Sequence, residues 1–182
     1  MKTLNRLALP VLTLYLWVVM TVFGAIVLET FMVYPNVFSD PPASLERTME
    51  FLVATGPNDF FPPLGFASWV LGAAALVLNW RRPAVRWLLL LSLGMLVAEG
   101  VVSMLYFWPR NTVMFSEGLA VHSADYLRQV AAEFETWHAL SRLIFNTVAA
   151  VAAFAAFLNA YANRIQHRGT AARRHSAAQN PA

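Results

Sequence analysis

The sequence predicts an all-α integral membrane protein built as a four-helix bundle. Of its 182 residues, 58% are hydrophobic and only 13% are charged, whereas soluble domains average about 45–50% apolar and about 25% charged residues. Four stretches also reach the length of about 20 apolar residues that a helix needs to cross a bilayer. This composition excludes a soluble globule, a disordered chain, a coiled coil and a nucleic-acid-binding protein.

The four predicted spans belong to one membrane domain, residues 1–163. The spans are residues 7–33, 60–80, 87–108 and 139–163. Three prolines lie near the starts of the first two spans, at Pro10, Pro62 and Pro63. We expect them in first helical turns, where the missing N–H costs little.

The distribution of basic residues predicts how the chain is oriented in the membrane. Nine of the 13 Lys and Arg residues lie in the N-terminal segment, in the loop between the second and third spans, or after the fourth span. The other two loops carry more acidic than basic residues. Because cytoplasmic segments are enriched in Lys and Arg, we expect a multi-pass protein of the cell inner membrane, with both termini cytoplasmic and both long loops outside.

The first outer loop carries its own helical pattern. Asp40 followed by two prolines is typical of a helix start, and Leu45, Met49 and Leu52 then recur at helical spacing until Gly56. These features predict a short interfacial helix that lies over the bundle.

The fourth helix is predicted to be unusually long. Ser123 is suited to cap a helix, and nothing from Ala124 to Asn163 interrupts one. A helix of about 40 residues is roughly 60 Å long, so it would project beyond the bilayer. The basic segment 164–182 has too little apolar surface to fold alone, and we expect a disordered cytoplasmic tail.

Polar residues inside the predicted spans are candidates for function, because an ionisable side chain in hydrocarbon costs several kcal/mol unless it is paired or hydrated. On the fourth helix Glu135 precedes three polar residues at spacings of three or four, which places all four on one face. We expect five polar side chains to meet in the outer half of the bundle: Glu29, Glu99, His138, Arg142 and Asn146.

Three interpretations of this cluster remain open. Glu135 and His138 form an E-x-x-H pair that, with Glu29 and Glu99, resembles half of a di-iron ligand set, although no second E-x-x-H is present. In a metal-free alternative, Arg142 pairs with one of these carboxylates and His138 exchanges a proton with a bound ligand. In a purely structural alternative, the same residues fix helix register.

The residues do not identify a cofactor. The chain has no cysteine, which excludes disulfides and thiolate metal sites. His138, at the outer end of the fourth span, is the one histidine expected to face the bundle interior, which argues against a haem with two histidine ligands. Tyr34, Tyr106, Trp108 and Trp137 fall near the outer interface, where an aromatic belt accounts for them.

The sequence resembles the anthrone-oxygenase-like domain family of small four-span membrane proteins over most of residues 8–162. The resemblance rests on three short segments: Glu29-Thr30-Phe31 to Tyr34-Pro35-Asn36, the Pro109-Arg110-Asn111 turn after the third span, and Trp137-His138 to Arg142. It implies a four-helix bundle that oxygenates an aromatic polyketide such as an anthrone. It points to these site residues: Asn36, Arg110, Asn111, Trp137, His138 and Arg142.

We therefore expect an outward-opening site that binds, and in an oxygenase oxidises, a small hydrophobic or aromatic molecule. His138 would handle a proton, Arg142 would stabilise an oxyanion, and Glu29 or Glu99 would orient them. Asn36, Arg110, Asn111, Trp137 and Asn146 are the candidate substrate-binding residues. The alternatives are a non-enzymatic membrane subunit and a small proton-coupled transporter. The expected partners are the lipid bilayer and this ligand but no nucleic acid, and homo-oligomer formation stays open.

Overall fold

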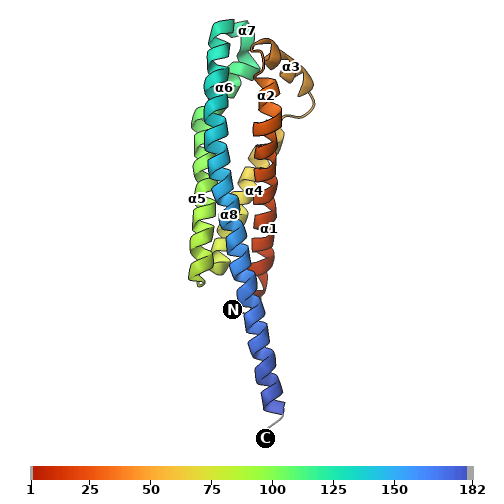
Figure 1. The fold of residues 1–182 in the computed structure, drawn as a ribbon, viewed down its shortest axis with the longest axis vertical. Coiled ribbons are helices and arrows are strands. Elements are labelled where there is room, and N and C mark those ends of the chain that lie inside the picture. The colour runs from red at the N-terminus through yellow and green to blue at the C-terminus, as the bar shows by residue number, and fades with distance from the viewer. Residues whose placement is uncertain (1, 180–182) are drawn as a thin grey trace.

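Four long apolar helices dominate the computed structural model of the chain, which describes the backbone of residues 2–179 and the side chains of residues 6–166 (Figure 1). Every element in this part of the chain is a helix. The helical stretches long and apolar enough to cross a membrane are Arg6–Val37, Pro57–Asn79, Pro83–Val121 and Ala124–Gln166. The prediction of an all-α protein with four candidate spans is therefore confirmed.

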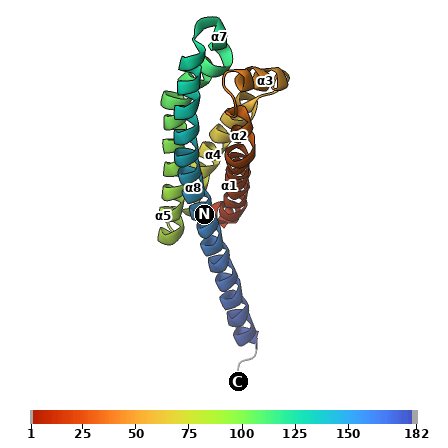
Figure 2. The same ribbon diagram turned by 45° about the horizontal axis from the view of Figure 1, so that its top comes forward.

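The four long helices form a closed ring in which each helix packs against two neighbours. Its helices are α1 (Lys2–Leu28), α4 (Pro57–Asn79), α5 (Pro83–Val102) and α8 (Ala124–Gln179). Each packs against the next, and α8 closes the ring against α1. Both chain ends lie at one end of the bundle, the termini end. The short helices α3 (Ala43–Phe51) and α7 (Gly118–Val121) cover the other, the loop end (Figures 1 and 2).

Three π-helical segments interrupt the regular helices near the loop end. The segment η1 (Glu29–Val33) joins α1 to α2 (Tyr34–Val37), and two more flank the short helix α6. Those two are η2 (Ser103–Phe107) and η3 (Val113–Glu117), with α6 (Trp108–Thr112) between them. Because one residue per turn is added in such segments, they change the direction of the side chains that follow. Nothing in the sequence analysis predicted them.

The third span is longer than predicted, and the expected turn at Pro109-Arg110-Asn111 is wrong. Pro109 is at the start of α6, and helical structure continues to Val121 before the chain reverses at His122 and Ser123. A proline normally disrupts a helix because it lacks an N–H and its ring meets the carbonyl four residues earlier. Here it directly follows η2, whose wider turn already breaks that hydrogen-bonding pattern.

The prolines of the first two spans also lie deeper than predicted. The helix α4 begins at Pro57, and the backbone N–H of Gly56 donates to the carboxylate of Asp59 at 2.8 Å. Pro62 and Pro63 are consequently interior residues, as is Pro10 in α1. Since a proline has no N–H, the carbonyls four residues before Pro62 and Pro63 lack their α-helical donors.

The first loop contains the short helix α3. Its Leu45 is buried among the aromatic residues of the loop end, whereas its last residue, Phe51, is 85% exposed. An exposed aromatic residue on this helix suits contact with a membrane surface, and its interfacial position stays a prediction.

The fourth helix, α8, starts at Ala124 as predicted, and the N–H of Tyr126 donates to the hydroxyl of Ser123. It runs on to Gln179, where the sequence predicted a disordered tail from residue 164. This segment is rich in Ala, Arg and Gln, which favour helix, and its first proline is Pro181. Residues 180–182 lie outside the described residues.

Each of the four long helices exposes large apolar side chains. Trp17 of α1, Val77 of α4, Leu91 of α5 and Val151 of α8 are between 43% and 72% exposed. Such exposure is expected when the surrounding solvent is lipid rather than water. The bundle interior near the termini end instead buries small residues, among them Ala149, Ala153, Ala156 and Ala160.

Candidate functional site

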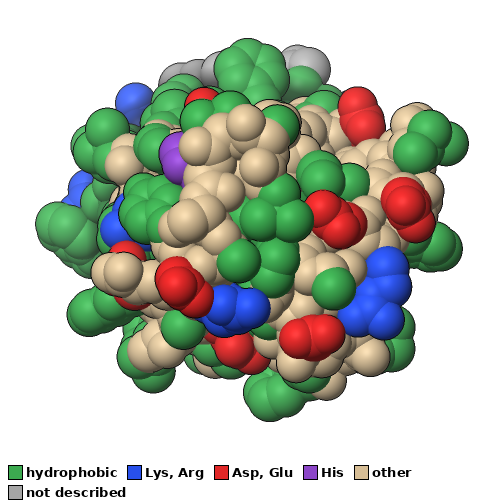
Figure 3. Space-filling view, turned by 90° about the horizontal axis from the view of Figure 1, so that it is seen from above, with side chains coloured by type: hydrophobic (Ala, Val, Ile, Leu, Met, Phe, Trp, Pro, Cys, Tyr) green, Lys and Arg blue, Asp and Glu red, His purple; other side chains and the backbone are tan. Residues whose placement is uncertain are grey.

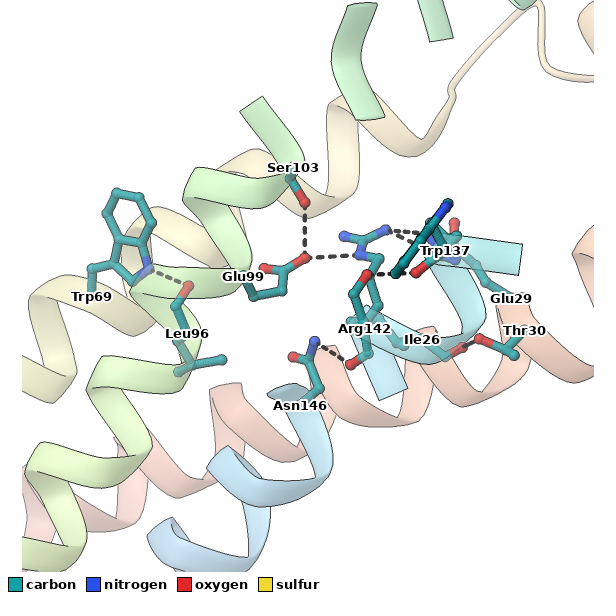
Figure 4. Close-up of polar contacts among 12 residues, drawn as sticks. Ile26, Glu29, Thr30, Trp69, Leu96, Glu99, Ser103, Trp137, Arg142 and Asn146 are labelled. Carbon is teal, nitrogen blue, oxygen red and sulfur yellow. Dashed lines mark hydrogen bonds and ion pairs between the residues drawn. The ribbon is translucent and has the colours of Figure 1, made fainter. Parts of the chain in front are cut away.

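A buried ion cluster lies in the loop half of the bundle, with Arg142 at its centre (Figure 4). The Nε of Arg142 donates to Oε1 of Glu99 at 2.8 Å, and its Nη1 lies 3.5 Å from Oε2 of Glu29. The side chains of Arg142 and Glu99 are each 14% exposed and that of Glu29 is 10% exposed. Helix α8, helix α5 and the segment η1 at the end of α1 therefore each contribute one ionisable side chain to a single site.

Two neutral polar residues support this cluster. The hydroxyl of Ser103 donates to the same Glu99 oxygen at 3.0 Å, one helical turn beyond it. The amide of Asn146 donates to the backbone carbonyl of Arg142 at 2.9 Å. Asn146 is thus buried beneath the cluster and steadies its backbone.

His138 completes the cluster from the next turn of α8. Its Nε2 lies 2.9 Å from Nη1 of Arg142. An arginine can only donate, so this nitrogen accepts and the proton of the neutral imidazole is on Nδ1. The Nδ1 atom is buried and has no hydrogen-bond partner in the described part of the chain. His138 therefore holds a donor that is free for another molecule.

Aromatic rings enclose His138. The centroid of the Tyr34 ring is 4.4 Å from that of the imidazole, and the rings of Phe107 and Phe134 are each 5.2 Å away. The Tyr34 side chain also lies beside Glu29 and Arg142. The sequence predicted that Tyr34 belongs to an aromatic belt, but the structure places its ring against the cluster.

Two of the π-helical segments begin at this site. The first starts at Glu29 itself and leads to Tyr34, and the second starts at Ser103. Departures of this kind are frequently found at functional sites because they reorient side chains. Two helices thus lose their regular geometry where their residues meet Arg142.

A cavity of about 230 Å³ adjoins the cluster between α4 and α5. Glu99, His138 and Arg142 line one side of it, and its other walls include Phe61 and Trp69. The guanidinium carbon of Arg142 lies 4.9 Å from the centre of the Phe61 ring, a cation–π contact. This first cavity is therefore an aromatic space with its charged groups on one wall.

Trp69 is held in that wall by two contacts. Its indole N–H donates to the carbonyl of Leu96 at 3.3 Å (Figure 4). Its ring also lies over Gly100, where an added Cβ would be only 2.4 Å from the indole Cζ2. Gly100 is therefore required for the position of this ring.

A second cavity, of about 570 Å³, lies beneath α3 at the loop end. Glu29 lines it, together with polar side chains that include Thr48, Asn58 and Ser116. Tyr34, Asn58, Trp108 and Asn111 are among the walls shared by the two cavities. Figure 3 shows the loop end from above, with acidic and basic side chains spread over it rather than gathered by sign.

The remaining predicted residues do not join the cluster. Glu135 and Trp137 are exposed, and the exposed Asn36 donates to the carbonyl of Met32 in its own helix. Arg110 lies on the Tyr106 ring and pairs with Glu133 at 3.4 Å. Asn111 is the one predicted residue of this group that lines the cavities.

The E-x-x-H pair is not brought together as a ligand set. Residues three apart differ by about 60° around a helix, and this rotation carries Glu135 to the exposed side of α8 while His138 stays inside. Among the described residues, no three His, Asp or Glu side chains are grouped so that they could hold a metal ion.

No model of a known protein family matches the sequence, and no curated protein or solved structure is significantly similar to it. The resemblance to the anthrone-oxygenase-like family accordingly stays a prediction, and the site is interpreted from its own geometry.

Proposed function

We propose that this protein is a multi-pass inner-membrane protein that binds a small hydrophobic or aromatic molecule in the first cavity. The observation that carries the proposal is the arrangement of Arg142, Glu99 and His138 on one wall of an otherwise aromatic cavity. Placing ionisable groups at such depth in a membrane costs free energy, so their presence indicates a functional site. A purely structural ion pair would not require a cavity beside it.

The walls suggest the class of ligand. The rings of Phe61, Trp69 and Phe107 favour a flat apolar body, and the cluster offers donors for an oxygen atom on that body. One of these donors is the unpartnered Nδ1–H of His138. A volume of about 230 Å³ is below the range of about 300–1,000 Å³ typical of pockets for drug-sized molecules. We infer a ligand of a few rings with a carbonyl or hydroxyl group.

The chemistry this site supports best is proton removal from such a ligand. Arg142 would stabilise the oxyanion that forms, because a fixed cation is most effective in a low-dielectric pocket. His138 donates to the same oxygen, and the Glu99 carboxylate accepts the proton. The family resemblance adds the following step, oxygenation of the resulting anion with dioxygen as oxidant.

This proposal is preferred over a proton-coupled transporter. Transport requires access to the site from both ends of the bundle, and both cavities lie in the loop half. Toward the termini end, the described interior is closely packed with alanines and larger aliphatic residues such as Leu12 and Leu89, and it includes the hydrogen-bonded pair of Tyr15 and Ser92.

Binding is tested with the full-length protein in detergent, titrated with anthrone while tryptophan fluorescence is recorded. Because Trp69 and Trp108 both line the cavity, we expect quenching that the double variant Trp69→Phe/Trp108→Phe abolishes. The matched control is Trp17→Phe on the lipid-facing side of α1, which should leave the quenching unchanged. Absence of quenching in the unmodified protein, or quenching that survives the double variant, would contradict the proposal.

The proposed orientation places the loop end outside the cell. Reporter fusions after Arg82 and Arg164 should report a cytoplasmic location, and a fusion within residues 44–53 should report the outside. A cytoplasmic signal from residues 44–53 would reverse the orientation and direct the second cavity toward the cytoplasm.

A further inference from the structure

The charges of the ion cluster do not balance. Glu29 and Glu99 supply two carboxylates against the single guanidinium of Arg142, and His138 is neutral because its Nε2 accepts from that guanidinium. With both carboxylates ionised, the buried cluster would carry a net charge of −1. An uncompensated charge in a low-dielectric interior is strongly unfavourable, so one carboxyl group must hold a proton when no ligand is present.

The contacts distinguish the two carboxylates. Glu99 accepts the charge-assisted hydrogen bond of Arg142 at 2.8 Å and a second bond from Ser103. Glu29 lies 3.5 Å from Arg142 and contacts the neutral side chain of Tyr34, and its Oε2 is buried without a hydrogen-bond partner in the described part of the chain. Ionised carboxylates are stabilised by such donors. These contacts indicate that Glu99 is the ionised carboxylate and that Glu29 is the protonated carboxyl group.

The cavities give these carboxylates different surroundings. Glu99 lines the aromatic first cavity, whereas Glu29 lines the second cavity beneath α3. The second cavity has polar walls that include Thr48, Asn58, Thr112 and Ser116, and Thr112 and Ser116 are exposed at the surface. It is roomy and polar enough to hold several waters. The charged and titratable groups that face Glu29 are Arg142 of α8, Tyr34 of α2 and Glu99 of α5.

We propose that Glu29 is a proton-exchanging carboxyl group that connects the buried cluster with water at the loop end through the second cavity. In the resting state the proton is on Glu29 Oε2, and the pair of Arg142 with Glu99 is neutral. When Glu99 takes up a proton from the first cavity and Arg142 moves toward Glu29, the Glu29 proton passes to a water molecule in the second cavity. The Glu29 carboxylate then takes over as the partner of Arg142, and the cluster stays neutral. No bond other than O–H changes, and no electron is transferred. The proposal does not depend on which ligand the first cavity takes.

Infrared spectroscopy tests the proton directly, without a ligand. The full-length protein is reconstituted in vesicles of an ether-linked phosphatidylcholine, which has no ester carbonyl, and the carbonyl stretch of a protonated carboxylic acid is recorded at neutral pH in H₂O and in D₂O. We expect one such band, with a shift to lower frequency in D₂O. Glu29→Asp should change its frequency, whereas Glu99→Asp should leave it in place, because both variants keep the carboxyl groups and disturb the fold little.

Glu133→Gln is the control for a carboxylate outside the cluster, and it should not alter the band. Absence of any protonated carboxyl band at neutral pH overturns the proposal. A band whose frequency follows Glu99→Asp rather than Glu29→Asp overturns it equally.

The route is tested by the rate at which that band shifts after transfer to D₂O. Ser116→Trp narrows the second cavity alone, and Met104→Trp narrows the first cavity alone. We expect slower exchange in Ser116→Trp and an unchanged rate in Met104→Trp. The reverse result would show that protons reach the cluster through the first cavity and would overturn the assigned route.

Discussion

The two halves of the bundle are packed in opposite ways. In the termini half, the alanines of α8 at positions 149, 153, 156 and 160 are at most 1% exposed. Small residues let helices approach closely in membranes, where dispersion contacts replace the hydrophobic effect as the driving force. A neutral polar contact between helices is buried there: Tyr15 and Ser92 join α1 to α5, and the hydroxyl of Ser92 donates to the carbonyl of Ala149 in α8.

In the loop half, large aromatic and charged side chains take the place of alanines. The helices depart from regular geometry at Glu29 and Ser103, and two cavities lie beside the cluster of Arg142. Such a region gains less from close packing and contains charges that have lost their water. Its stability consequently depends on a few specific hydrogen bonds.

The comparison indicates that the closely packed termini half holds the helices in place, so that the loop half can contain cavities and charged side chains. Close packing near the termini fixes the positions of α1, α5 and α8, and the same three helices carry Glu29, Glu99 and Arg142 into the site. Substitutions in the loop half should therefore change charge balance and binding, whereas substitutions in the termini half should change stability alone.

The largest expected effect comes from Arg142→Met. Removing the guanidinium leaves the carboxylate of Glu99 buried without a partner, which costs about 3–5 kcal/mol. We expect a marked loss of thermal stability in detergent, followed by circular dichroism. A second change to Glu99→Leu should recover most of it, because that carboxylate makes the shorter contact at 2.8 Å.

The double variant with Glu29→Leu is the matched control for this experiment. It leaves Glu99 charged and alone, so it should recover little. If Arg142→Met were harmless by itself, the guanidinium would have to reach water at the surface, and the inward-facing cluster would be wrong.

Much of the fold could be predicted because composition is decisive in a bilayer. In a bilayer, every backbone N–H and C=O group must be hydrogen-bonded within the protein. A long uncharged stretch can therefore form few structures other than a helix. The convergence of Glu29, Glu99, His138 and Arg142 could be anticipated for the same reason, since each is a costly exception within an apolar stretch. Depth along each span then placed them at one level.

The rest of the site could not be predicted, because the spacing of residues along the sequence does not show which way a side chain faces or where a helix changes its hydrogen-bonding pattern. Phe61 and Trp69 are apolar, and a sequence does not show whether an aromatic ring faces lipid or a cavity. The π-helical segments arise from a hydrogen-bond register that no residue type specifies, so Tyr34 and Pro109 were misplaced. Glu135 has the right spacing from His138, but it lies on the exposed side of α8.

A smaller effect is expected from Gly100→Ala in the loop half. The new Cβ would be 2.4 Å from the Trp69 ring, which has to move toward the first cavity. Overpacking of this kind costs about 1–3 kcal/mol, and anthrone binding should weaken. Gly94→Ala is the control on the same helix, because nothing lies within 4 Å of its added Cβ. It should be neutral or stabilising by about 0.5–1 kcal/mol. Equal effects of the two substitutions would show that Trp69 is not fixed by Gly100.

The smallest expected effect concerns the neutral contact of the termini half. The hydroxyl of Ser92 donates to the carbonyl of Ala149 at 2.8 Å, so Tyr15 must be the donor in its 2.7 Å bond with Ser92. We expect Tyr15→Phe and Ser92→Ala to be destabilising, with a coupling energy of about 0.6 kcal/mol, the average for hydrogen bonds between membrane helices.

Unfolding of the four proteins of this double-mutant cycle in a denaturing detergent measures the coupling energy. Thr21 serves as the control, because its exposed hydroxyl donates only to the carbonyl of Trp17 in the same helix. Thr21→Ala combined with Ser92→Ala should show no coupling. Anthrone binding should be unchanged in Tyr15→Phe, since close packing of α1 against α8 keeps Glu29 in place without this hydroxyl. A loss of binding in Tyr15→Phe would show that the two halves are not separable, and that the neutral contact also positions the charged site.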